Sequence, residues 1–277
     1  MSIVKRRLGK TGKDVTVLGL GGEGVLRTFG REREAYELIN LALDLGINYF
    51  DSAKAYSGSE SYYGAALGDR REEIFLTSKS HARDKQEALL HLQETLENMK
   101  TDYLDLWQIH DVRTKEDLEQ IFSPGGAIEA FIEAKEEGLT RFVGVTGHLE
   151  PKIIRRCLER YEFDTVLVPL NPAESGFKSF IEEVVPLALK KRVGIIGMKV
   201  YLKGLPLKLP KFTSLEPFFR YALSHPISTA IIGCDNTTQL KENLEYADSF
   251  KPLSEREKKK LEDHIWPYAR QLMYYKQ

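Results

Sequence analysis

Residues 46–56 read GINYFDSAKAY, and the interpretation of the whole chain starts from this stretch. A short apolar run at 47–50 ends abruptly at Asp51, and Tyr56 follows five residues later in a turn of small residues. An acid at the end of a strand with a phenol just beyond it suits proton transfer. The same pattern also describes an ordinary strand-to-helix turn in which the aspartate caps and the tyrosine packs. The rest of the chain has to decide between the two.

The same unit recurs along the sequence. Short apolar runs end near residues 21, 51, 79, 110, 146, 171, 198 and 233, and a helical pattern follows each of them. The expected helices cover about 31–45, 59–67, 85–99, 126–137, 152–160, 180–190, 215–223, 238–247 and 255–273. Eight such units predict an α/β fold of the (βα)8, or TIM barrel, type, although an open sheet would have the same periodicity.

The segments between these units add three expectations. A Gly-rich turn at 9–13 between β-type residues predicts an N-terminal β-hairpin that leads into a strand. The glycines at 21–24 are expected to end that strand. Residues 111–123 and 203–211 are expected to be loops. No linker rich in serine, glycine or proline divides the chain, so a single domain over residues 1–277 is expected.

Composition excludes several classes of protein. Of 277 residues, 42% are hydrophobic and 29% charged, and the net charge of −1 gives no basic field for nucleic acid or a membrane surface. No apolar run reaches the roughly 18 residues of a membrane span, and the basic N-terminus lacks an apolar signal core, so a cytoplasmic protein is expected. Cys157 and Cys234 form no CxxC pair and are expected to be reduced thiols.

Four polar residues lie at consecutive strand ends: Asp51, Tyr56, Lys79 and His110. Strand ends of a barrel converge on one face, so the four side chains can share a pocket. There a lysine ammonium would lower the pKa of the tyrosine, the aspartate would hold the lysine, and the histidine would donate a hydrogen bond to a substrate oxygen. This set can protonate a developing alkoxide, which suits carbonyl reduction if another group supplies hydride.

Each residue alone has an ordinary explanation: a capping aspartate, a packed tyrosine, a surface lysine and a core histidine. Their position at successive strand ends is what favours a joint site. The other histidines have no HExxH or paired-ligand spacing, so no metal is expected; they are His81, His91, His148, His225 and His264. His148 also lies at a strand end.

Over nearly its whole length the sequence resembles the aldo-keto reductase family. The motifs are RLGKTG at 7–12, LGLGG at 18–22, NYFDSA at 48–53 with Tyr56 and SE at 59–60, Lys79, DLWQIH at 105–110, AIIG at 230–233 and QLKEN at 239–243. The resemblance, which is to the short-loop prokaryotic branch, implies a (βα)8 barrel, no metal and a nicotinamide cofactor extended across the barrel mouth. It implies that Asp51, Tyr56, Lys79 and His110 are the catalytic tetrad, with Tyr56 as general acid and hydride from the nicotinamide.

The implied cofactor positions match less closely. Thr146-Gly147-His148 stands where the family has Ser-Asn, Leu167 replaces a common glutamine, and Met198 replaces a frequent stacking tyrosine. The residues implied to contact the cofactor are Gly22, Thr146, Asn171, Met198, Lys199, Gly233, Asp235, Gln239, Glu242 and Asn243.

The identity of the nicotinamide stays open at this stage. The family favours NADP, but Cys234, Asp235 and Gln239 replace the basic residues that usually bind its 2′-phosphate. An aspartate suits a ribose hydroxyl better, which favours NAD or dual use, unless Lys199 or Lys203 supplies the charge.

The expected activity is NAD(P)H-dependent reduction of a small-molecule aldehyde or ketone by a monomer or weak homo-oligomer. Loops after the fourth and seventh strands and the C-terminal segment at 266–275 are expected to shape the pocket, with Glu23 at its mouth. The aromatic side chains of that segment either line the pocket or pack the last helix onto the barrel, and packing is favoured. Two alternatives remain: a nicotinamide-binding regulatory protein with little turnover, and a lyase or isomerase that uses Lys79 covalently.

Overall fold

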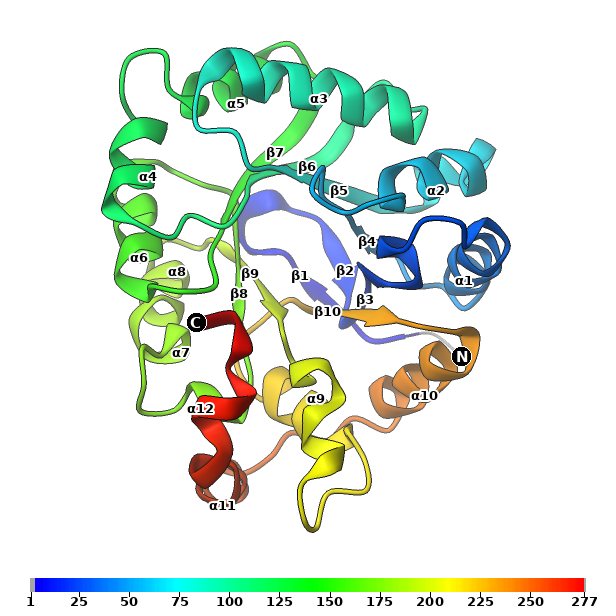
Figure 1. The fold of residues 1–277 in the computed structure, drawn as a ribbon, viewed down its shortest axis with the longest axis vertical. Coiled ribbons are helices and arrows are strands. Elements are labelled where there is room, and N and C mark those ends of the chain that lie inside the picture. Colours follow the sequence, from blue (N-terminus) through cyan, green and yellow to red (C-terminus); the bar gives the residue numbers. More distant parts are fainter. Residues whose placement is uncertain (1–2, 277) are drawn as a thin grey trace.

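A closed barrel forms the frame of the molecule. In residues 3–276, which the computed structural model describes, eight parallel strands close in the order β10-β3-β4-β5-β6-β7-β8-β9. Figure 1 shows the helices arranged around these strands. The predicted (βα)8 fold is confirmed, and the open-sheet alternative is wrong because β9 and β10 pair and complete the ring.

The barrel strands begin after the hairpin that β1 (Lys5–Arg7) and β2 (Asp14–Thr16) form. They are β3 (Leu18–Gly24), β4 (Tyr49–Asp51), β5 (Phe75–Ser80), β6 (Leu104–Ile109), β7 (Thr140–Thr146), β8 (Thr165–Pro169), β9 (Gly194–Met198) and β10 (Thr229–Cys234). The helices are α1 (Glu32–Asp44), α2 (Ser59–Ala66), α3 (Lys85–Met99), α4 (Lys115–Ile121), α5 (Ala127–Glu136), α6 (Pro151–Arg160), α7 (Phe180–Glu183), α8 (Val185–Lys190), α9 (Glu216–Leu223), α10 (Thr237–Asp248), α11 (Glu255–Ile265) and α12 (Ala269–Leu272).

The register of β4 and β5 places Asp51 and Lys79 close together on neighbouring strands. Asp51 lies opposite Thr77, the residue two before Lys79 on the same strand. Side chains alternate along a strand, so Thr77 and Lys79 point to the same side, into the barrel. In the next pair Lys79 lies opposite Gln108. The polar residues at these strand ends therefore gather on one face of the barrel, as the sequence predicted.

The hairpin plugs the opposite end of the barrel. Leu8 and Val15 are fully buried and pack with the inward-facing Tyr49, Phe75 and Leu106. Gly9, at φ +49°, lets the turn approach β9 so closely that a Cβ there would lie 2.2 Å from the backbone nitrogen of Gly194. The predicted N-terminal hairpin is confirmed, and it closes the bottom of the barrel with apolar side chains.

Two expected segments differ from the structure. The loop expected at 111–123 contains α4, whose first turn is closed by reciprocal hydrogen bonds between Thr114 and Asp117, a capping box. The glycines expected to end the first barrel strand lie within it, because β3 runs through to Gly24.

The expected helices at 180–190 and 255–273 are each interrupted. A prolyl nitrogen has no hydrogen to donate to the preceding turn, and Pro186 and Pro267 lie just after the breaks. In the expected loop at 203–211, the chain forms a 3-10 segment over Leu202–Lys208. Within residues 3–276, no helix combines the length and the apolar character needed to cross a membrane.

Truncating a buried side chain of the hairpin should lower the stability of the fold. We expect Leu8→Ala to lower the free energy of unfolding by about 2–5 kcal/mol, because it opens a cavity between the hairpin and the barrel interior. Val4→Ala in the same hairpin segment is the control, since the Val4 side chain is 52% exposed. Urea unfolding followed by circular dichroism measures both; equal stabilities of the two variants would contradict the plug.

Candidate active site

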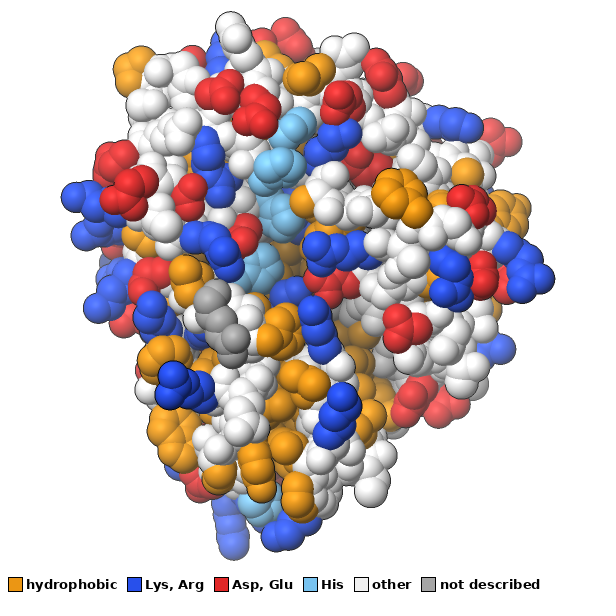
Figure 2. Space-filling model, in the orientation of Figure 1, with side chains coloured by type: hydrophobic (Ala, Val, Ile, Leu, Met, Phe, Trp, Pro, Cys, Tyr) orange, Lys and Arg blue, Asp and Glu red, His pale blue; other side chains and the backbone are white. Residues whose placement is uncertain are grey.

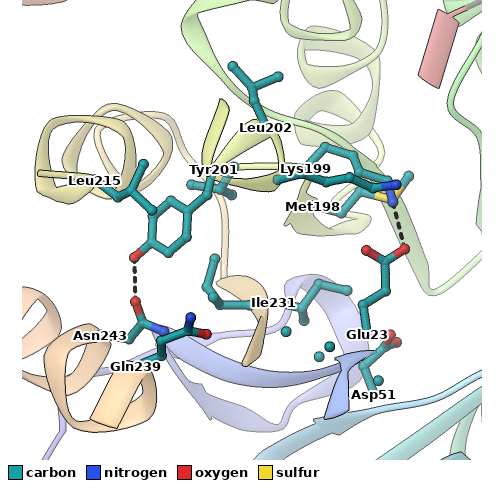
Figure 3. Close-up of a pocket in the computed structure, with 18 of the residues that line it drawn as sticks. Glu23, Asp51, Met198, Lys199, Tyr201, Leu202, Leu215, Ile231, Gln239 and Asn243 are labelled. Carbon is teal, nitrogen blue, oxygen red and sulfur yellow. Dashed lines mark hydrogen bonds and ion pairs between the residues drawn. The ribbon is translucent and has the colours of Figure 1, made fainter. Parts of the chain in front are cut away.

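A cleft opens at the carboxyl ends of the barrel strands. Its volume is about 510 Å³, and its walls come from the ends of the barrel strands, the segment after β9 and the first turns of α10. Figure 2 shows the hollow near the centre of this face of the molecule, and Figure 3 shows the side chains that line it. Asp51, Tyr56, Lys79 and His110 all line the cleft, so the structure brings the four predicted site residues together.

Asp51 and Lys79 form a buried ion pair at the base of the cleft. Lys79 Nζ lies 2.6 Å from Asp51 Oδ2 and donates a second bond of 2.6 Å to the carbonyl oxygen of Ser52. The Thr77 hydroxyl donates to the other carboxylate oxygen at 3.0 Å. Burial lowers the pKa of Lys79 and raises that of Asp51, and in each case the charge of the partner opposes the change. The two charges therefore depend on each other.

Tyr56 lies over the lysine, held by the turn after β4. Its backbone nitrogen donates to the carbonyl of Ala53 at 2.8 Å, and Lys79 Nζ lies 5.1 Å from the centre of its ring. Gly22 packs against it so tightly that a Cβ at that position would lie 2.8 Å from Tyr56 Cδ2. The Arg27 guanidinium lies 4.9 Å from the same ring centre.

The direction of the pKa shift of Tyr56 differs from the one expected. Burial raises the pKa of Tyr56 well above its ordinary value, and the carboxylates of Asp51 and Glu23 raise it further. The net change is opposite to the expected lowering, because desolvation of the phenolate and the nearby carboxylates outweigh the cations around the ring. The phenol is therefore neutral at pH 7, in the form that donates a proton.

His110 approaches the tyrosine edge-on. The two ring centres are 6.0 Å apart and the ring planes are inclined at 84°. Burial lowers the pKa of His110 well below its ordinary value, and the charge of Lys79 acts in the same direction. The imidazole is therefore neutral at pH 7 and offers one N–H donor in the cleft.

A second histidine extends the site, and the sequence argument did not include it. His148 lines the cleft with its ring centre 6.2 Å from that of His110, and its Nδ1 lies 2.7 Å from Asp111 Oδ1. Burial alone would raise the pKa of Asp111, but the hydrogen bond and charge of His148 bring it down to about 2. The sequence feature that could have identified His148 as a cleft residue is its position just after a predicted strand.

The predicted cofactor residues line the same cleft with one exception. Those in its wall are Gly22, Thr146, Met198, Lys199, Gly233, Asp235, Gln239, Glu242 and Asn243. Leu167 is also in the wall. Asn171 is fully buried outside the wall, where its amide donates to the carbonyl of Lys199 and to the Tyr275 hydroxyl. Through these two hydrogen bonds, Asn171 connects the C-terminal segment to the loop after β9.

Two contacts span the cleft, as Figure 3 shows. At one end Lys199 Nζ lies 2.9 Å from Glu23 Oε1. At the other end the Tyr201 hydroxyl donates to Asn243 Oδ1 at 2.8 Å. Burial would raise the pKa of Glu23, but the ammonium of Lys199 holds it below its ordinary value. Glu23 was expected at the mouth, whereas Tyr201 was missed because it follows the strand end inside a segment without a clear pattern.

Comparison with known proteins agrees with this geometry. A model of the Aldo/keto reductase family matches residues 17–210, and the chain belongs to that family. Relatives include the oxidoreductase YqkF of Bacillus subtilis, 26% identical over 94% of this chain and 96% of the relative. L-galactose dehydrogenase of Arabidopsis thaliana is 28% identical over 86% of each chain. The holo form of the aldo-keto reductase AKR11C1 from Bacillus halodurans superposes with a TM-score of 0.79, at 26% identity, over 95% of this chain and 96% of that one.

Removing one charge of the buried pair should cost stability. We expect Asp51→Asn to lower the free energy of unfolding by about 3–5 kcal/mol, because Lys79 is left buried without a counter-charge. The double variant Asp51→Asn/Lys79→Met should recover much of this loss. Chemical unfolding measures both.

Asp44→Asn is the control, because Asp44 pairs with Arg70 at the surface. A loss for Asp51→Asn no greater than that for the control would mean that the pair does not hold the strand ends together.

Proposed function

We propose that this aldo-keto reductase family member reduces an aldehyde or ketone to the alcohol with NAD(P)H, and that Tyr56 is the general acid. The observation that carries the proposal is a neutral, half-buried phenol in the cleft wall, with an ammonium group 5.1 Å from its ring centre and a neutral imidazole beside it. An acid that is protonated at working pH and lies beside a cation can give up its proton and leave a stabilised phenolate.

The cleft suits an extended dinucleotide. Its volume of about 510 Å³ lies within the usual range for ligand sites. Gly22 and Gly233 line the cleft, and a Cβ at either position would meet neighbouring protein atoms at 2.7–3.0 Å, so only glycine fits these two places in the wall. Thr146 and Met198 would hold the nicotinamide end and Glu242 and Asn243 the adenine end. The bound nicotinamide would supply hydride to the carbonyl carbon.

The side chains of the chain itself would supply the proton and the orientation. As the carbonyl carbon gains hydride, its oxygen becomes an alkoxide and takes the proton from the Tyr56 hydroxyl. Lys79, fixed by Asp51, stabilises the phenolate that remains until solvent returns a proton. The neutral His110 donates a hydrogen bond to the substrate oxygen and directs it toward the phenol.

The two alternatives have less support. A lyase that uses a covalent lysine intermediate needs a free amine. Lys79 Nζ is instead hydrogen-bonded to Asp51 and to the Ser52 carbonyl, and the residue is 1% exposed. A regulatory protein that only binds nicotinamide has no use for a neutral acid held over a buried ion pair.

Replacing the phenol tests the acid directly. We expect Tyr56→Phe to lower kcat for aldehyde reduction by roughly 10²–10⁴-fold, because it removes only the donated proton. Binding of NADPH or NADH, followed by fluorescence titration, should change little. Tyr36→Phe on α1 is the control, since Tyr36 is 53% exposed. Full turnover of Tyr56→Phe with every active aldehyde would refute the assignment.

The carboxylate of Asp235, near the start of α10, affects whether NADH or NADPH binds better. Asp235 is hydrogen-bonded to Gln239, with Asp235 N donating to Gln239 Oε1 at 2.8 Å. Lys199 is paired with Glu23 and Lys203 lies 4.4 Å from the Tyr274 ring centre, so neither contacts Asp235. A carboxylate suits a ribose hydroxyl and repels a phosphate. We therefore propose that the chain accepts NADH at least as well as NADPH.

Changing this charge should change the preference. We expect Asp235→Ser/Gln239→Arg to tighten NADPH binding by roughly 10–100-fold, since a guanidinium adds a charged hydrogen bond to the 2′-phosphate. Binding of NADH should change far less, and titrations of both cofactors measure the ratio. Asp248→Ser, at the far end of α10, is the control. A wild type that binds NADPH far more tightly than NADH would contradict the proposed preference.

A further inference from the structure

Two histidines and a glutamate meet outside the cleft, beside the end of β5. Glu87 and His91 are four residues apart on α3, and His81 lies in the turn between β5 and that helix. Their ligand atoms all lie within 4.8 Å of one another, and His91 Nε2 is 3.9 Å from Glu87 Oε1. The rings of His81 and His91 have centres 4.7 Å apart and planes inclined at 45°. Within residues 3–276, no other group of three such side chains is this compact.

We infer that His81, Glu87 and His91 form a binding site for a divalent transition-metal ion of the Zn²⁺ class. Two imidazoles and one carboxylate are a donor set that Zn²⁺ prefers, with water in the fourth position. Ligand atoms around tetrahedral Zn²⁺ are about 3.4 Å apart, given bonds of about 2.0–2.1 Å. The ligand atoms need to approach one another by up to about 1.4 Å, which rotation of the exposed His81 and Glu87 side chains can provide.

The half-buried His91 is already oriented for this role. Its Nδ1 lies 2.9 Å from Ser80 Oγ, an atom that also accepts from the backbone nitrogen of Ala82 at 3.2 Å. That contact fixes the ring and leaves Nε2 facing Glu87, which is how a neighbouring polar group orients a metal-bound histidine. The nearby Lys54 is paired with Glu94 at 2.7 Å, so it does not take the Glu87 carboxylate.

The site joins α3 to a segment that supports the active site. The carbonyl of Ser80 accepts from the backbone nitrogen of His110 at 2.8 Å. The Arg83 guanidinium donates to the carbonyl oxygens of His110 and Asp111 at 3.0 and 2.9 Å. An ion on His81 and His91 would tie this segment to the helix, and none of its three ligands lines the cleft. Figure 2 shows histidine side chains running from the upper part of this face toward the hollow.

The spacing of the histidines did not predict this group. His81 and His91 belong to no short metal-binding motif, and the glutamate precedes its histidine by one helical turn. Only the turn from β5 into α3 brings His81 back onto the face that Glu87 and His91 share. The inference concerns a structural ion and does not depend on the proposed reductase activity.

Calorimetric titration of the full chain with ZnCl₂, after treatment with chelator, tests the site. We expect one ion per chain with a Kd of about 10 µM or tighter. His81→Gln and His91→Gln should each weaken binding by at least roughly tenfold, and Glu87→Gln by a smaller factor. His264→Gln, an isolated exposed histidine on α11, is the control and should bind as the wild type does.

Two further readouts separate the site from other sources of binding. Saturating Zn²⁺ should raise the thermal midpoint of the wild type and of His264→Gln but not of His91→Gln, whose midpoint without metal shows whether it folds. Bound Co²⁺ should give four-coordinate visible bands without a thiolate charge-transfer band, since both cysteines are buried elsewhere. No saturable binding below about 100 µM, or equal binding by the wild type and both histidine variants, would overturn the inference.

Discussion

The ion pair between Lys79 and Asp51 is the constraint on which the active site depends. Its atoms are 2.6 Å apart and both residues are 1% exposed, so neither charge can be solvated by water. Such a pair is stable only where its geometry is fixed and its other hydrogen-bonding groups are satisfied, here by Thr77 and the Ser52 carbonyl. The register of β4 against β5 supplies that geometry, and closure of the barrel holds the register. A polar interaction that is costly to bury therefore rests on the strand pairing of the closed barrel.

The same burial determines which chemistry the site can perform. Tyr56 is half-buried and His110 is buried, and this desolvation raises the pKa of the phenol and lowers that of the imidazole, so both groups are neutral at pH 7. In the proposed reaction, Tyr56 is the acid and His110 the hydrogen-bond donor, and the Lys79 cation lies 5.1 Å from the centre of the phenol ring on which charge would develop. Preorganised groups of this kind cost no reorganisation when the reaction occurs. The ends of the barrel strands form part of the cleft wall, and the segment after β9 and the first turns of α10 form the rest without contributing to the ion pair.

The sequence predicted the barrel and the convergence of Asp51, Tyr56, Lys79 and His110 on one cleft because both follow from local patterns. Alternating β and α periodicity marks the strand ends, and the fold brings those ends to one face. Features that depend on neighbours in space were harder to predict. The pKa of Tyr56 is raised because burial outweighs Lys79, and burial cannot be read from adjacent residues. His148 lies in the cleft wall, where its ring is hydrogen-bonded to Asp111. Asn171 lies outside the wall, where its amide donates hydrogen bonds to the Tyr275 hydroxyl and the Lys199 carbonyl. Helix α4 was missed although Thr114 and Asp117 carry its capping signal.

The central claim is that this site transfers hydride to a carbonyl carbon while the protein supplies the proton. The most direct measurement uses NADH and NADPH deuterated at C4 of the dihydronicotinamide, with a panel of aldehydes and mass spectrometry of the products. We expect an alcohol with one deuterium on the former carbonyl carbon and an exchangeable proton on its oxygen. Tight binding of the cofactor with no labelled alcohol from any aldehyde or ketone would contradict it.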